Sequence, residues 1–316
     1  MKKLSVLFLS LLLCGCTIIP HKAVSLEQCR IITALGIDRT ETGYRLTCFE
    51  GTDLSEGDDP NPDALFSVEG DTLTGALSNL RAVSDRRPVP DYAGFILLGL
   101  PLTENGVIQV LSELYDNPDF PYSVPVLLAE ADAETVLKTI AKKTADLSGS
   151  IESMLRSADR LSLPEAPSVS EFYNLVSAPE RDPCLPCLSE KDGTVTLDGC
   201  GIFRGEKLVS VLKDDAARGI GVLSGSARDY PLLLNRNTTV YLRRIRIRQQ
   251  GEATELKLYG DTSSNEDSSF LAEAACKKVN GWITAALNAL NQEGSRVLKH
   301  KTTSAKIICR IKELNS

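Results

Sequence analysis

The chain has 316 residues, of which 42% are hydrophobic and 24% are charged, and its formal net charge is -7. This composition is typical of a folded globular protein and excludes a fibrous or intrinsically disordered chain. The acidic balance argues against nucleic acid as a partner, because phosphate binding needs a basic surface, and it also disfavours adhesion to anionic lipid. The length suggests two or three domains.

The first sixteen residues predict a lipoprotein signal peptide. Residues 1–3 form a short basic start, residues 4–13 an apolar run, and Leu13-Cys14-Gly15-Cys16 fits a cleavage-and-lipidation box. This run is typical of a secretory signal, since a membrane-spanning helix needs about 20 apolar residues. We expect removal of the signal peptide, residues 1–15, and acylation of Cys16, which would tether the protein outside a bacterial plasma membrane by fatty chains such as palmitate. The alternative is an ordinary signal peptide with a chance cysteine.

The first half of the mature chain alternates between strand and helix patterns. Strands separated by helices of this length predict a mixed sheet covered by helices. Asp71-Thr72 is expected to cap the first helix, which runs to residue 83. The other predicted helices are 104–115 and 132–142, and the predicted strands are 29–38, 44–50, 65–68, 94–99 and 122–129.

The second half contains a break in composition. Residues 147–177 have a weaker helical pattern, and residues 178–199 are rich in Pro, Asp and Gly, which predicts a domain boundary. Beyond it we expect strands at 195–203, 208–212, 237–248, 254–259 and 303–311, and helices at 214–223 and 267–291. The last helix has an apolar stripe at helical spacing, which predicts that it packs on a sheet.

The expected fold class is α+β, with three domains whose mixed β-sheets pack against helices, after the N-terminal lipoprotein signal peptide. The predicted domains are an N-terminal α/β domain with the lipid-anchor segment at 16–180, a small middle α+β domain at 181–228, and a C-terminal α+β domain with the long helix at 229–316.

One short segment is basic, although the chain as a whole is acidic. In residues 241–248, YLRRIRIR, basic side chains largely alternate with apolar ones. This pattern predicts a strand with one solvated arginine face, and the alternative is a true anion-binding site.

Seven cysteines remain after removal of Cys14 and acylation of Cys16, so at least one thiol cannot pair within the chain. Cys184 and Cys187 are three residues apart, with Cys200 downstream, a spacing that fits a redox pair or part of a zinc site. The sequence offers no evident fourth ligand, since the only histidines are His21 and His300. Buried free thiols are therefore the favoured interpretation, and a local disulfide is the alternative. The remaining four are Cys29, Cys48, Cys276 and Cys309.

Catalytic motifs are missing from the sequence. It has no Gly-rich phosphate loop before Lys-Ser/Thr, no Gly-x-Ser-x-Gly elbow and no His-Glu-x-x-His helix. The acidic runs 56–63 and 261–267 do not fit a calcium-binding loop and are interpreted as solvated loops. We therefore predict no enzyme, no catalytic residue, no cofactor and no metal, and Cys16 is the one functional residue that the sequence assigns.

Several motifs occur in order along most of the mature chain. Leu35-Gly-Ile-Asp38 followed by Gly43-Tyr-Arg-Leu-Thr47 is similar to the opening hairpin of the Ger(x)C, or GerAC-like, spore germination lipoproteins. The segments 70–77, 94–99, 114–120, 181–186, 199–209 and 218–219 are similar to later elements of this family, in the same order. The chain departs from the family at Asn117, at Cys184 and Cys187, and in a shorter stretch after the long C-terminal helix.

The resemblance implies the C subunit of a nutrient germinant receptor, a three-domain lipoprotein on the outer face of the spore inner membrane. Its implied partners are the integral-membrane A and B type receptor subunits, and its implied role is non-catalytic help in starting germination. Two other classes stay open: an extracytoplasmic solute-binding lipoprotein, which should show two similar lobes around a cleft, and a thiol-redox module that uses Cys184 and Cys187.

Overall fold

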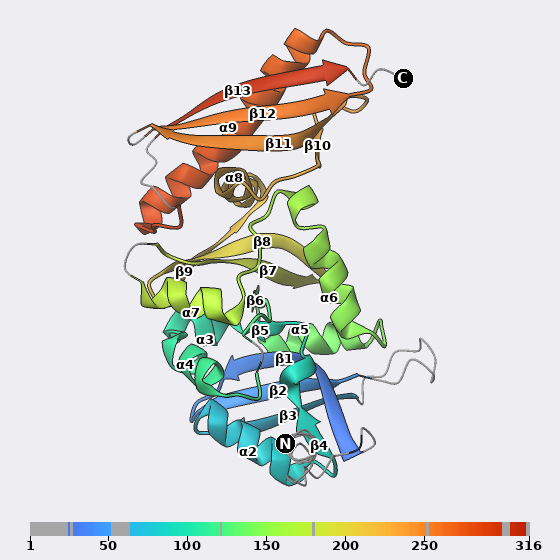
Figure 1. Cartoon of the computed structure of the whole chain (residues 1–316), viewed down its shortest axis with the longest axis vertical. Coiled ribbons are helices and arrows are strands. Elements are labelled where there is room, and N and C mark those ends of the chain that lie inside the picture. The colour runs from blue at the N-terminus through green and yellow to red at the C-terminus, as the bar shows by residue number, and fades with distance from the viewer. Residues whose placement is uncertain are drawn as a thin grey trace, which may run out of the picture.

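The computed structural model describes residues 25, 28–51, 64–120, 122–178, 181–250, 253–298 and 304–313. The predicted signal peptide, the predicted lipidation site Cys16, both histidines and the acidic run 56–63 lie outside these residues. The molecule is elongated, with a large sheet towards the N-terminal end and a small sheet towards the C-terminal end (Figure 1). None of the helices in the described part of the chain is long and apolar enough to cross a bilayer.

The large sheet contains nine strands within the described residues, in the order β3-β2-β1-β5-β6-β7-β8-β9, with the short β4 paired beside β1. Strands β1, β5, β6 and β7 run parallel, and antiparallel strands complete both sides. The bounds are β1 Cys29–Arg39, β2 Tyr44–Glu50, β3 Leu65–Gly70, β4 Arg87–Val89, β5 Ile96–Leu98, β6 Val126–Ala129, β7 Cys184–Lys191, β8 Thr194–Arg204 and β9 Lys207–Lys213.

Helices cover both faces of the large sheet. In β5, Ile96 and Leu98 pack into one core and Leu97 into the other, and all three are fully buried. Such continuously apolar strands are typical of parallel sheets covered on both sides. On one face lie α2 Leu73–Val83, α3 Leu100–Asn105, α4 Ile108–Asp116 and α7 Val169–Ser177; on the other lie α5 Ala133–Ala141 and α6 Leu147–Arg156. Two short 3-10 turns occupy Pro90–Tyr92 and Asp159–Leu161.

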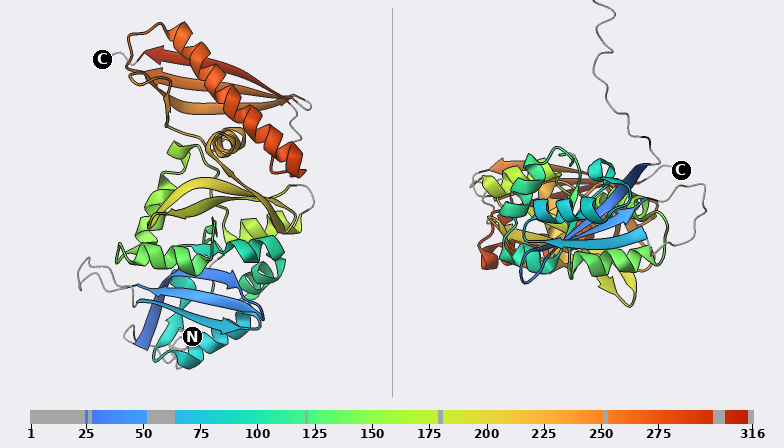
Figure 2. Two further views of the ribbon diagram at one scale, coloured as in Figure 1. Left: turned by 180° about the vertical axis from the view of Figure 1, so that it is seen from behind. Right: turned by 90° about the horizontal axis from the view of Figure 1, so that it is seen from below.

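The small sheet has the order β10-β11-β12-β13 and is covered on one face by the long helix α9 (Figure 2). The bounds are β10 Tyr230–Leu233, β11 Thr239–Gln250, β12 Ala253–Thr262, α9 Ser268–Glu293 and β13 Ser304–Glu313. Strands β12 and β13 are parallel, because α9 connects them as a crossover. Helix α8, Asp214–Ser224, contacts α9 on one side and β8 and β9 on the other, so one hydrophobic core runs through both sheets.

The predicted α+β fold with mixed sheets packed against helices is confirmed. The helix expected at 104–115 is instead two helices, α3 and α4. The chain breaks at Gly106, whose φ of 120° is outside the helical range, and the Val107 N–H donates to the Glu206 carbonyl across to the β8–β9 turn. Strand β10 was not predicted at all.

The segment expected to be an irregular boundary, residues 178–199, contains β7. This strand lies between β6 and β8 and pairs with β6 through Leu128 with Cys187 and Ala129 with Leu188. Strands β7 to β9, from the predicted middle domain, therefore extend the same sheet as the N-terminal strands. The division into three domains stays a prediction.

Candidate functional site

The motif Leu35-Gly-Ile-Asp38 builds the junction between β1 and α5. The buried Asp38 carboxylate accepts hydrogen bonds from the backbone N–H groups of Ala133 at 2.7 Å and Glu134 at 3.0 Å, at the N-terminus of α5. A Cβ atom on Gly36 would lie 2.8 Å from a methyl carbon of Leu137, so glycine there allows α5 to pack closely. This motif supports the fold.

Burial dominates the electrostatics of Asp38. It raises the pKa of the Asp38 carboxyl from 3.8 to about 6, against the opposing effect of the two backbone hydrogen bonds. A perturbed carboxyl is often a catalytic candidate. Here both oxygens are occupied by the helix cap, so the structure assigns Asp38 a structural role.

A second motif residue, Asp182, connects three parts of the chain. Its carboxylate is 2% exposed and accepts hydrogen bonds from the backbone N–H of Gly205 at 2.8 Å and of Arg296 at 2.5 Å. Its own backbone N–H donates to the Arg296 carbonyl at 3.1 Å. Asp182 therefore joins the segment before β7, the β8–β9 turn and the segment after α9.

Neighbouring groups strengthen the same connection. Arg181 Nε donates to the Val297 carbonyl at 2.7 Å, and the Ser295 hydroxyl donates to the Phe203 carbonyl at 2.6 Å. The part of the chain that follows α9 is thus fixed against the large sheet by polar contacts. These contacts form one wall of a cavity.

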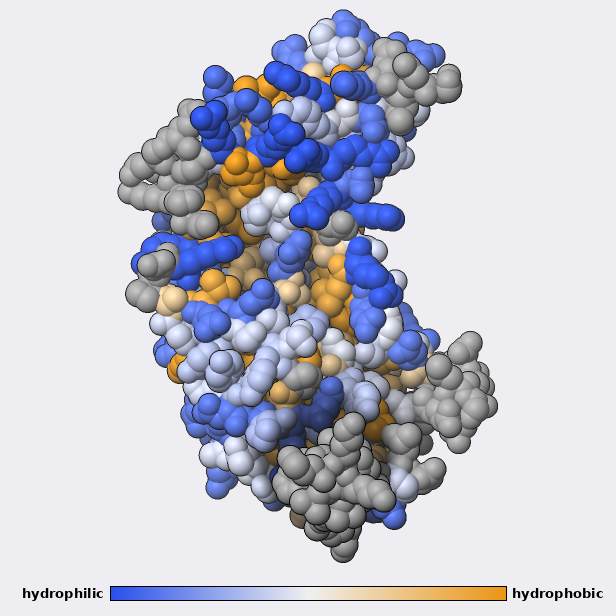
Figure 3. Space-filling model, viewed as in Figure 1, coloured by the Kyte–Doolittle hydropathy of each residue, from blue (hydrophilic) through white to orange (hydrophobic). Residues whose placement is uncertain are grey.

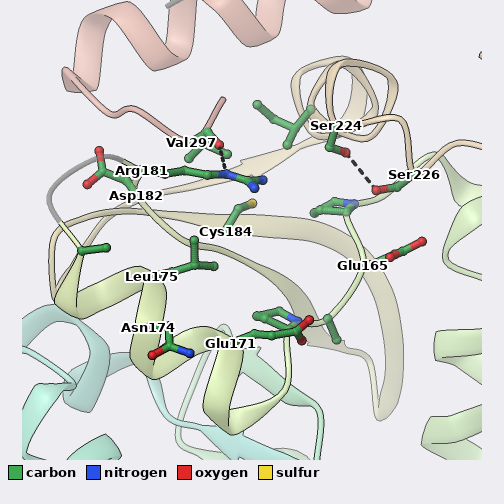
Figure 4. Close-up of a pocket in the computed structure, with 15 residues that line it drawn as sticks. Glu165, Glu171, Asn174, Leu175, Arg181, Asp182, Cys184, Ser224, Ser226 and Val297 are labelled. Atoms are coloured by element: carbon green, nitrogen blue, oxygen red, sulfur yellow. Dashed lines mark hydrogen bonds between the residues drawn. The ribbon is translucent and has the colours of Figure 1, made fainter. Parts of the chain in front are cut away.

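The cavity has a volume of about 640 Å³ and lies between α7, the end of α8 and the segment around Val297 (Figure 4). This volume is within the range of small-molecule sites. Its lining residues come from four separate stretches of the chain: Pro164, Glu165, Ala166, Pro167, Glu171, Asn174, Leu175, Ala178, Arg181, Asp182, Cys184, Ile220, Ser224, Ser226 and Val297.

The polar side chains of the cavity can bind a ligand. The backbone N–H and the hydroxyl of Ser168 both donate to the Glu171 carboxylate at 2.8 Å and lower its pKa, so this group stays ionised. The Arg181 guanidinium points into the cavity (Figure 4). A carboxylate and a guanidinium suit a small polar or zwitterionic molecule. The lining has no histidine, and its one thiol is Cys184.

The surroundings of the cysteine cluster disfavour a redox or zinc centre. The seven described cysteines are free thiols, and Cys187 and Cys200 are fully buried. Burial raises the pKa of Cys187, and a hydrogen bond with Cys184 together with burial raises the pKa of Cys200. Redox and zinc chemistry both use thiolates, which these environments disfavour. Within the described residues, no group of three or more His, Cys, Asp or Glu side chains is placed to hold a metal.

The sequence did not reveal the cavity, because its lining residues come from separate stretches of the chain. Segment 181–186 and Cys184 were singled out for other reasons, and neither indicated a cavity. A further local signal is the pair Ser168 and Glu171, which forms a capping box at the start of α7. That signal predicts a helix start and says nothing about a ligand.

The structure therefore defines a class: an α+β protein of two mixed sheets joined through one core, with a cavity of mixed polar and apolar lining beside the connection. Residues 22–190, more than half of the chain, match the family model described as the spore germination protein N-terminal domain. The chain belongs to this family, as its motifs predicted.

Two relatives extend the comparison. The chain is 21% identical over 203 residues to the spore germination protein GerQC of Bacillus cereus, an alignment that covers 64% of this chain and 55% of GerQC. The chain thus spans about half the length of this curated relative. Its fold is similar to that of the GerBC protein in a crystal structure, with a TM-score of 0.50 and 15% identity, over 89% of this chain and 97% of GerBC.

Proposed function

We propose that this chain is the C subunit of a spore nutrient germinant receptor and acts without catalysis in receptor assembly or signalling. The observation that carries the proposal is the family match over residues 22–190. The fold likeness to GerBC is consistent with it. The roles of Asp38 and Asp182 in capping and bracing also support a protein whose motifs preserve a shape for partners.

The proposed location is the outer face of the spore inner membrane. Acylated Cys16 would hold the chain there, beside integral-membrane A and B type subunits as partners. The support is the sequence of residues 1–16, with its basic start, short apolar run and lipidation box.

A deletion and complementation experiment tests this proposal. Spores that lack the gene, and any paralogous C subunit, should lose germination in response to the receptor's nutrient, and the wild-type gene should restore it. Cys16→Ala should fail to restore it, because the anchor is lost. Cys14→Ala is the matched control, since Cys14 lies on the discarded side of the cleavage site, and it should complement fully.

Normal nutrient germination without the gene would refute the receptor role. Full complementation by Cys16→Ala would refute the lipid anchor but would leave the receptor role standing. Copurification of the chain with the A or B subunit from wild-type spores, and its loss without those subunits, provides a direct readout of the partners.

The cavity favours a second candidate, binding of a small polar solute by this chain. Two unlike sheets do not form the pair of similar lobes expected of a solute-binding lipoprotein. A cavity with an ionised glutamate and an arginine nevertheless suits amino acids. A raised melting temperature with one nutrient of an amino acid and sugar panel, lost in Glu171→Gln, would support this candidate.

A further inference from the structure

The face of the small sheet opposite α9 is open. In β12, Leu256 and Leu258 are buried beneath α9, while the alternate residues Lys257 and Tyr259 point to the other side. Figure 1 shows this open face towards the viewer, and the view from behind in Figure 2 shows α9 over the opposite face. No helix of the described chain packs against it.

Strand register brings basic residues from three strands together on this face. On β11, Arg244, Arg246 and Arg248 pair with Tyr259, Lys257 and Glu255 of β12. These three residues pair in turn with Arg310, Ile308 and Lys306 of β13. Residues directly opposite each other share one face of a sheet. We call the following set the basic face: Arg244, Arg246, Arg248, Lys257, Lys306, Arg310 and Lys312. In the same view, Figure 3 shows strongly hydrophilic side chains gathered over these strands.

The charge on this face is far from balanced. Its two carboxylates, Glu255 and Asp261, already have cationic partners: Lys257 lies 3.1 Å from Glu255, and the exposed Arg243 lies 2.8 Å from Asp261 and 3.0 Å from Asp229. Within the described residues no ion pair forms at five exposed members of the basic face: Arg244, Arg248, Lys306, Arg310 and Lys312. The face is thus strongly positive in a chain whose net charge is -7.

Protection of sheet edges explains only part of this arrangement. Charged residues, lysines above all, commonly line edge strands and prevent pairing with another chain. Strand β13 is such an edge, and so is the part of β11 that carries Arg244, Arg246 and Arg248, because β10 pairs with β11 only through Thr239–Leu242. Lys257, however, lies on β12 and is paired on both sides, beside Arg246. The positive charge therefore extends across the face, from one edge to the other.

We propose that the basic face binds the anionic headgroups of a lipid bilayer. The cations are spread over three neighbouring strands about 4.8 Å apart, so they present positive charge over an area, as a layer of anionic headgroups presents negative charge. The exposed Tyr241 and the partly exposed Tyr259, with Arg246 over the Tyr259 ring at 5.3 Å, supply the amphipathic rings found at membrane interfaces. This proposal depends on the proposed function in one respect, which is that an acyl anchor would hold the chain beside a bilayer.

Vesicle binding without the anchor tests the proposal independently of germination. The chain from residue 16 onward, with Cys16→Ser, retains every described helix and strand and excludes any acyl contribution. It should sediment with vesicles of phosphatidylcholine and phosphatidylglycerol, and should not sediment with phosphatidylcholine alone. Added salt should release it, because such attraction is screened.

Matched variants locate the binding surface. Arg244→Gln, Arg248→Gln and Arg310→Gln together should weaken vesicle binding about 100-fold, from the usual gain per basic residue at an anionic surface. The control combines Lys142→Gln, Lys191→Gln and Arg204→Gln, three exposed cations of the large sheet region that form no ion pair within the described residues. It makes the same change in net charge. The control should bind like the parent chain, and both variants should melt like it.

Equal loss in both triple variants, or equal binding to both kinds of vesicle, would overturn the proposal. A chain that ignores the vesicles but binds poly-glutamate through the basic face would also overturn it and would identify an acidic protein as the partner. Vesicle binding without any effect of the gene on germination would leave the proposal standing and refute only the receptor role.

Discussion

The two sheets of this protein differ in how much of their surface is covered. Strand β5 in the large sheet has Ile96, Leu97 and Leu98 fully buried, with helices on both faces. In the small sheet only the α9 side is covered, and Arg244 and Arg248 are exposed on the other. In the region of the large sheet the buried carboxylates Asp38 and Asp182 act as a cap and a brace, whereas the small sheet has an uncovered face of basic residues.

The largest expected effect concerns the core between the two sheets. Trp282 of α9 is 2% exposed, packs edge-on against Tyr230 at 5.4 Å and lies beneath Arg218 of α8 at 5.8 Å. Trp282→Ala should lower the free energy of unfolding by about 3–5 kcal/mol, measured by urea denaturation. If the shared core makes both sheets unfold together, the loss of unfolding free energy should appear in a single unfolding transition. Trp282→Phe, the control, should lose less, and two separate transitions would show that the sheets unfold independently.

The second largest effect on the free energy of unfolding is expected at Asp182, which connects the two regions. Asp182→Ala removes the acceptor of two backbone hydrogen bonds and should lower the free energy of unfolding by about 3 kcal/mol. Asp182→Asn keeps one acceptor oxygen and should lose about half as much. A change below about 0.5 kcal/mol in Asp182→Ala would mean that the brace contributes nothing to joining the two regions.

The buried carboxyl of Asp38 should make the free energy of unfolding depend on pH. Because its pKa rises from 3.8 to about 6 on folding, the folded state binds this proton more tightly than the unfolded chain. The Asp38 contribution to the free energy of unfolding is thus most favourable below pH 4 and falls by about 3 kcal/mol as the pH rises to 6. Subtracting the pH profile of Asp38→Asn from that of the wild type isolates this slope, and a flat difference would contradict it.

The smallest effect should come from the open face. Arg244→Gln, Arg248→Gln and Arg310→Gln should each change the free energy of unfolding by less than about 0.5 kcal/mol, because these side chains are exposed and form no ion pair within the described residues. The same urea measurement checks this. A loss above about 2 kcal/mol from one of them would show that the face is packed in the folded chain and is not free for a partner.

The sequence predicted elements where local signals were strong. The hairpin β1–β2, the cap Thr72 of α2 and the long α9 all follow from alternation, capping and helical spacing, and the structure confirms them. Strand β7 was missed because it is buried between two strands, and its proline-containing apolar run does not alternate. The helix expected at 104–115 was wrong because its break at Gly106 is coupled to a distant turn through Val107 and Glu206.

By itself, the sequence determined the family, the α+β class and one arginine-rich strand, since these depend on local order along the chain. It did not reveal the cavity. Its net charge suggested a protein unsuited to anionic lipid, because net charge averages over the whole molecule and does not report a local basic surface. Only the tertiary structure assembled the cavity at Arg181 and Glu171. Only the pairing of β12 with β11 and β13 placed Lys306, Arg310 and Lys312 on the same face as Arg248. The physical reason is that side chains from distant segments share a surface only after the strands have paired.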